Sequence, residues 1–148
     1  MQVVIDTHVL LRLFGRRGQH RELREALLNG RVAWAVSTDV LLEYEELVVA
    51  KASRDAWENI RSLLRLLSIR FGTVVEVEPT FRFQVISVDP DDNKFADCAI
   101  VANADFVITE DAHFAPLATA GYKPQVISPM KFSERFCHGD DGQPGGTP

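Results

Sequence analysis

Short apolar runs alternate along the chain with longer stretches in which apolar residues recur at helical spacing. The short runs, at 3–5, 32–36, 73–77, 106–108 and 125–127, have the β-branched and aromatic character of buried strands. The longer stretches predict helices at 7–14, 19–28, from 37 or 38 onward, 54–71, 92–103, 114–118 and 129–136. This alternation predicts an α/β fold with a central, mostly parallel sheet of four to five strands and helices on both faces.

Acidic residues gather where the predicted strands end, which is where ligands bind in open parallel sheets. Asp6 follows the first strand, and Glu110 and Asp111 follow the strand at 106–108. Asp6 and Asp92 also fit helix N-caps, and Asp111 fits the start of a helix. Asp97 has no such explanation, because a charge inside an apolar helix is costly unless it is paired or bound to a metal. Further acids lie at 43, 89, 91 and 92.

Carboxylates that converge on one point repel one another, and divalent cations relieve that repulsion. Hard oxygen ligands suit Mg²⁺ or Mn²⁺, and two such ions can activate a water molecule and stabilise the leaving oxygen in phosphodiester cleavage. The formal net charge of −5 argues against a protein that binds nucleic acid through a basic surface. It argues less against a nuclease whose acids are neutralised by bound metal.

Composition places the chain among small globular proteins. We expect one domain over residues 1–137 and a flexible Gly/Pro-rich tail over 138–148, which has no apolar residue to bury. No run approaches the roughly 20 apolar residues that cross a bilayer. The beginning of the chain lacks a secretory pattern, and two cysteines, Cys98 and Cys137, are too few for a disulfide framework. We therefore expect a cytoplasmic protein without membrane contact.

Taken together, four motifs resemble those of PIN-domain proteins, above all the VapC-like ribonuclease toxins of type II toxin–antitoxin systems. The motifs are Val-Ile-Asp6-Thr7, Glu43 in its helix, Asp92-Asn-Lys-Phe-Ala-Asp97 and Val-Ile-Thr109-Glu-Asp111. The resemblance covers about residues 1–136. It implies a three-layer α/β/α sandwich and an endoribonuclease that hydrolyses RNA phosphodiesters with Mg²⁺ or Mn²⁺. It also implies a small antitoxin partner and, as in many relatives, a possible homodimer.

The resemblance also implies roles for individual residues. Asp6, Glu43 and Asp111 are the implied catalytic metal ligands, and the remaining ligand is Asp97 or Asp92, with Asp97 ranked first. Residues expected to support these ligands are Thr7, His8, Asn93, Thr109 and His113. His8 stands where the family commonly has asparagine, and His113 where many relatives carry a further acid. Arg12, Arg16, Arg17 and Arg21 form a basic cluster that either contacts RNA phosphates or is a solvated helix face.

Two other functions compete with this interpretation. The first is a catalytically inactive PIN-fold module that binds proteins, which His8 and His113 leave open. The second is a phosphatase with a nucleophilic aspartate, which needs a second acid two residues after the first and has His8 there instead. A nucleotide-binding module is disfavoured because the glycine-rich phosphate loops are absent.

Overall fold

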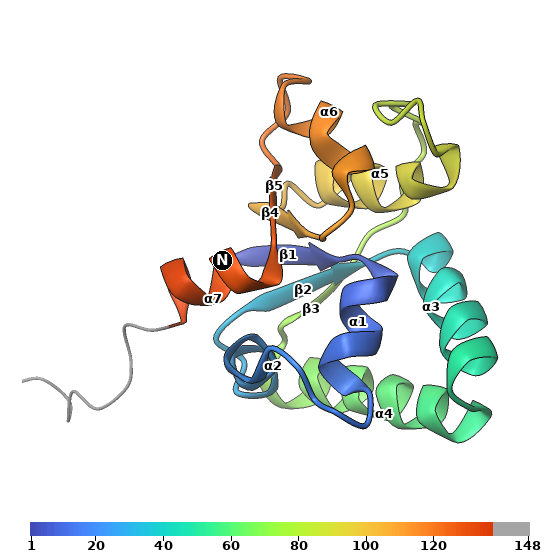
Figure 1. Ribbon diagram of the computed structural model, residues 1–148, viewed down its shortest axis with the longest axis vertical. Coiled ribbons are helices and arrows are strands. Elements are labelled where there is room, and N and C mark those ends of the chain that lie inside the picture. Colours follow the sequence, from blue (N-terminus) through green and yellow to red (C-terminus); the bar gives the residue numbers. More distant parts are fainter. Residues whose placement is uncertain (138–148) are drawn as a thin grey trace, which may run out of the picture.

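The computed structural model describes residues 1–137, in which strands and helices alternate along the chain (Figure 1). The strands are β1 (Gln2–Ile5), β2 (Ala33–Val36), β3 (Val74–Glu76), β4 (Phe106–Ile108) and β5 (Gln125–Ile127). The helices are α1 (Thr7–Phe14), α2 (Arg21–Leu28), α3 (Thr38–Lys51), α4 (Arg54–Phe71), α5 (Asn93–Val101), α6 (Ala115–Ala118) and α7 (Pro129–Phe136). Two 3₁₀ turns, η1 (Pro90–Asp92) and η2 (Ala112–Phe114), precede α5 and α6.

The five strands form one parallel sheet in the order β3-β2-β1-β4-β5. The chain runs outward from β1 to β3 through α1–α4, then returns across the sheet to β4 and β5 through α5 and α6. Since parallel crossovers are right-handed, reversing the direction puts the two sets of helices on opposite faces. Figure 1 shows α5 and α6 on one side and α1, α2 and α4 on the other. The predicted three-layer α/β fold is confirmed.

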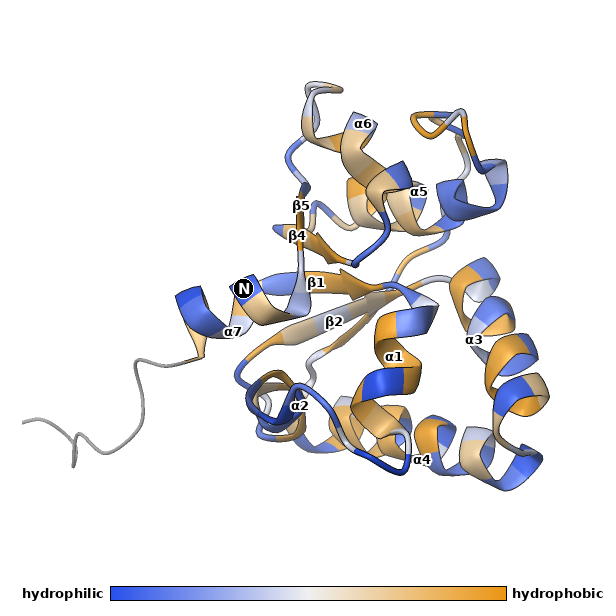
Figure 2. Cartoon of the chain, viewed as in Figure 1, coloured by the Kyte–Doolittle hydropathy of each residue, from blue (hydrophilic) through white to orange (hydrophobic). Residues whose placement is uncertain are grey.

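The centre of the sheet is the core, because β1 and β4 are covered on both faces. Val4 and Val107 are completely buried, and Figure 2 shows both strands largely in the apolar colour. Tyr44 of α3 lies beside them: its hydroxyl donates to the carbonyl of Ile5 at 2.5 Å and accepts from Nε1 of Trp34 at 3.3 Å. These bonds fix α3 against the carboxyl end of β1, which Asp6 follows directly.

Most predicted element boundaries agree with the structure to within two residues. The second helix begins at Arg21 rather than residue 19, because His20 has a left-handed backbone with φ of 55°. Ser37 is the cap of α3, since its hydroxyl accepts from the amide of Val40. Within residues 1–137 no helix is both long and apolar enough to cross a membrane. The predicted tail at 138–148 lies outside the described residues.

Candidate functional site

Asp6 lies at the carboxyl end of β1 and is only 4% exposed. Ile5 and Ile108 are partners in the β1–β4 ladder, so Asp6 lies beside Thr109. The Thr109 hydroxyl donates to Oδ2 of Asp6 at 2.9 Å. Burial raises the pKa of Asp6, and the Thr109 hydrogen bond opposes that rise. Asp6 occupies the predicted N-cap position of α1, but its side chain makes no cap hydrogen bond to the helix.

Thr109 also joins Asp6 to Asp111. Its hydroxyl oxygen accepts from the amide of Asp111 at 3.0 Å while its proton goes to Asp6. Asp111 in turn caps η2, with Oδ1 accepting from the amide of His113 at 2.8 Å. Side chains alternate direction along an extended backbone, so Glu110 points away from its two neighbours. The end of β4 therefore presents Thr109 and Asp111 on the side of Asp6.

Asp92 and Asp89 lie at the other border of this site, at the ends of η1. Oδ2 of Asp92 is buried and has no hydrogen-bond partner within residues 1–137. Burial, together with repulsion from Asp89, Asp6 and Asp111, raises the pKa of Asp92 to about 7. Asp92 was also a candidate N-cap, but it makes no cap hydrogen bond to α5. It is instead a carboxylate held among other carboxylates.

This group of residues suits a divalent cation. Asp89, Asp92 and His113 each offer a ligand atom, and the three atoms lie within 4.8 Å of one another. The charges acting on Asp92 include Asp6 and Asp111, so all three acids share one neighbourhood. In residues 1–137 no lysine or arginine forms an ion pair with Asp6, Asp92 or Asp111. The Asp111 carboxylate lies 3.4 Å from Nδ1 of His113, whose amide it also accepts from. Within the described residues, the charges of His8 and His113 oppose this repulsion, and no lysine or arginine does.

Glu43 and Asp97, the other two predicted ligands, lie in a neighbouring groove of about 660 Å³. Oε2 of Glu43 is 3.1 Å from Nζ of Lys94. Asp97 is 8% exposed and accepts from the amide of Phe83 at 3.1 Å. The charges acting on Asp97 come from Arg82 and Asp39 rather than from Asp6 or Asp111. The charges of Asp6 and Asp111 thus act on Asp92 but are not among the charges that act on Asp97.

Some of the predicted supporting residues act on the site acids, and others do not. Thr109 bridges Asp6 and Asp111 as described, and His8 is an exposed residue whose charge lowers the pKa of Asp6. Thr7 is buried with a hydroxyl that has no partner in the described chain. The Asn93 side chain bonds to the backbone of Ile86 rather than to a carboxylate. Its Oδ1 accepts from the amide of Ile86 at 2.9 Å, and its Nδ2 donates to the carbonyl of Ile86 at 2.8 Å. Asn93 thus fixes the connector before η1.

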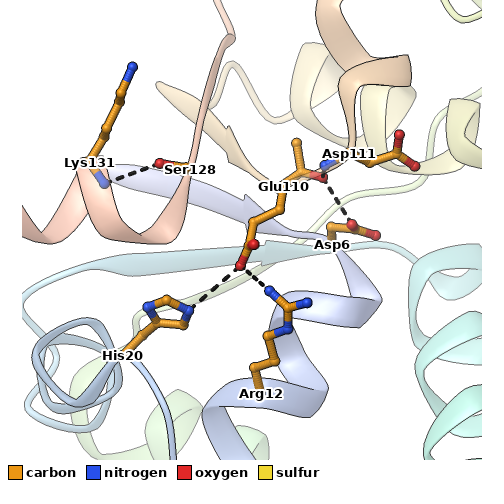
Figure 3. A network of polar contacts seen from close by, with 8 residues as sticks. Asp6, Arg12, His20, Glu110, Asp111, Ser128 and Lys131 are labelled. Carbon is orange, nitrogen blue, oxygen red and sulfur yellow. Dashed lines mark hydrogen bonds and ion pairs between the residues drawn. The ribbon is translucent and has the colours of Figure 1, made fainter.

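The predicted RNA-binding arginines also differ from one another. Figure 3 shows Glu110 pointing away from Asp111 towards Arg12, with which it forms an ion pair, and His20, whose Nε2 lies 3.6 Å from Oε1 of Glu110. Arg21 pairs with Glu25 of its own helix at 2.8 Å. Arg16 and Arg17 are exposed residues that follow the end of α1. The length of that helix, roughly 12 Å, separates them from Asp6.

Two residues fall outside the predicted set: Asp89, which lies at the site, and Lys94, which lies beside Glu43 in the neighbouring groove. Asp89 has a recognisable signal, because an aspartate before Pro90 is typical of a helix start. In a 3₁₀ turn residues three apart lie on one side, so Asp89 and Asp92 could have been paired from their spacing. Lys94 had no comparable signal, since its partner Glu43 is 51 residues away.

The raised pKa of Asp92 predicts a stability change for Asp92→Asn without metal. The folded state holds the Asp92 proton more tightly than the unfolded state, whose pKa is near the ordinary 3.8, so stability falls as pH rises from about 4 to about 7. Asparagine stays neutral. In EDTA the variant should therefore be more stable at pH 8, by about 1 kcal/mol after allowing for solvent screening, and the gain should vanish near pH 4.

Thermal melts across this pH range measure the effect, and Asp105→Asn is the matched control. Asp105 accepts from the amide of Gln2 at 2.9 Å, which lowers its pKa, so its removal should cost stability above pH 4. A lower melting temperature for Asp92→Asn at pH 8 would contradict the prediction.

Comparison with known proteins gives two matches. A family model described as PIN domain matches residues 2–113, a range that contains Asp6, Glu43, Asp92, Asp97 and Asp111. The crystal structure of VapBC2 from Rickettsia felis, bound to a DNA fragment from its promoter, has a similar fold with a TM-score of 0.55. It is 16% identical, and the match covers 85% of this chain and 98% of that one. No curated protein sequence matches this chain.

Proposed function

Because this chain belongs to the PIN domain family, we propose that it is a divalent-metal-dependent nuclease that hydrolyses RNA phosphodiesters. One observation carries the proposal. Asp6, Asp92 and Asp111 come from three separate elements to one neighbourhood, and in the described chain none of them is paired with a lysine or arginine. A protein gains nothing in stability from such a cluster, since mutual repulsion and burial both oppose ionisation. A bound cation supplies the compensation.

Asp6, Asp92 and Asp111 would hold the metal, with Asp89 and His113 within reach. Carboxylate oxygens favour Mg²⁺ or Mn²⁺. When bound, the ion lowers the pKa of a water molecule and neutralises charge on the phosphodiester oxygens. Thr109 holds the Asp6 side chain and the Asp111 backbone in fixed positions relative to each other, because its hydroxyl forms a hydrogen bond with each. The buried, unpartnered Oδ2 of Asp92 is available to a ligand without breaking any existing hydrogen bond.

We further propose that the nuclease is the toxin of a toxin–antitoxin pair with a small antitoxin partner. The Rickettsia felis neighbour, whose fold this chain shares, was crystallised as VapBC2 on promoter DNA. Arg12, which forms an ion pair with Glu110 (Figure 3), is our candidate for a contact to an RNA phosphate. A homodimer stays a prediction from the resemblance.

The proposal is tested with purified protein and an end-labelled single-stranded RNA. We expect cleavage products with Mn²⁺ or Mg²⁺ and none when EDTA is added, because the carboxylates alone provide no Lewis acid for the phosphate oxygens. A labelled DNA of the same sequence shows whether the substrate class is RNA. Metal binding without any cleavage would favour the inactive interaction module, and preferential cleavage of DNA would replace the substrate.

A further inference from the structure

The five predicted ligand acids fall into two groups that differ in charge compensation. Asp6, Asp92 and Asp111 have no lysine or arginine partner within residues 1–137. Glu43 is bound by Lys94, and Asp97 lies near Arg82 and accepts from the amide of Phe83. The protein thus leaves the first group for a ligand to neutralise, whereas it pairs Glu43 with a lysine of its own.

Lys94 is held firmly in position to neutralise Glu43. It lies in the first turn of α5, two residues after Asp92, and reaches across to α3, which packs against α5. Nζ of Lys94 is 3.1 Å from Oε2 of Glu43, and the two side chains are only 24% and 22% exposed. Water screens a half-buried pair of this kind less than a surface pair, so the attraction is stronger than that of ordinary exposed ion pairs.

We propose that Lys94 provides, as a permanent part of the fold, the positive charge that a second divalent cation would bring to Glu43, so that each chain binds one metal ion. The inference rests on the proposed function for the existence of that ion. A second ion at Glu43 would lie within a few ångströms of the Lys94 ammonium, and the repulsion in a partly buried groove disfavours it. The ammonium also has three donors, so it can bind Glu43 and a phosphate oxygen together.

Three other acids line the groove: Asp39, Glu46 and Asp91. They are exposed, so solvent and salt screen them, and of the three only Asp39 is among the charges that act on Asp97. Arg82 is exposed, and its charge lowers the pKa of Asp97. Lys94 therefore lies against Glu43, one of the two most enclosed carboxylates of the groove, where a bound ion would otherwise be needed.

The test counts bound Mn²⁺ by isothermal titration calorimetry and by electron paramagnetic resonance of the free ion. We expect one Mn²⁺ per wild-type chain and two per Lys94→Met chain, since methionine keeps an unbranched side chain of nearly the same length and removes its charge. Lys94→Arg is the matched control and should bind one ion. The double variant Lys94→Met with Glu43→Gln should also return to one, because the second site then lacks its carboxylate.

Each outcome decides the inference. Two ions in the wild-type chain, or one ion in a folded Lys94→Met chain, would overturn it. Lys94→Gln serves as the neutral variant if Lys94→Met does not fold. A protein that binds one ion, gains a second through Lys94→Met and cleaves no RNA would support Lys94 and remove the nuclease proposal. A wild-type chain that binds no Mn²⁺ at all would remove both.

Discussion

Replacing Asp6 with asparagine should reduce RNA cleavage by about a thousandfold or more, roughly 4 kcal/mol of transition-state stabilisation. Asp6 is nearly buried, and no lysine or arginine within the described chain neutralises it, so its charge is available to a metal ion. Asparagine has the same shape and keeps an oxygen for the Thr109 hydroxyl. The fold should therefore persist while Mn²⁺ binding weakens strongly.

Cleavage of labelled RNA and Mn²⁺ titration measure the two effects, and the melting temperature reports on the fold. Asp105→Asn is the control, because it makes the same change at the opposite end of β4, where Asp105 pairs with Lys123 at 3.4 Å. We expect activity close to wild type in that variant. An Asp6→Asn protein that cleaves RNA at the wild-type rate would remove Asp6 from the proposed metal site.

Asp92→Asn should lower cleavage by at least about a hundredfold, and Asp97→Asn by less than about tenfold. Asp92 shares its neighbourhood with Asp6 and Asp111, and its buried Oδ2 has no partner. Asp97 holds the connector through the Phe83 amide, and asparagine can still accept that hydrogen bond. A tenfold loss is about 1.4 kcal/mol, which suits a change in positioning rather than the loss of a metal ligand.

The two variants carry the same substitution on one short segment, five positions apart, so each controls for the other. RNA cleavage and Mn²⁺ affinity are measured side by side at pH 8, where Asp92 is ionised. A large loss in Asp97→Asn with little change in Asp92→Asn would restore the ranking made from the sequence. It would mean that metal binding moves Asp97 into the site.

The sequence by itself determined the elements and their order. Buried strands and amphipathic helices are written in local periodicity, because a strand repeats every two residues and a helix every 3.6. The alternation of the two then specified the layered parallel sheet. It also placed Asp6 and Asp111 correctly at one edge, since both follow directly from where the neighbouring strands β1 and β4 end.

Tertiary structure alone decided how the acids divide. Asp92 and Asp97 are almost equivalent in the sequence, but the connector before η1 folds over α5 so that Phe83 contacts Asp97, while Asn93 holds Ile86. Likewise Glu43 meets Lys94 only because α3 packs against α5. Periodicity is a property of neighbouring residues and can be read from the chain. The charge state of a carboxylate depends on which groups surround it, and these come from elements far apart in the sequence.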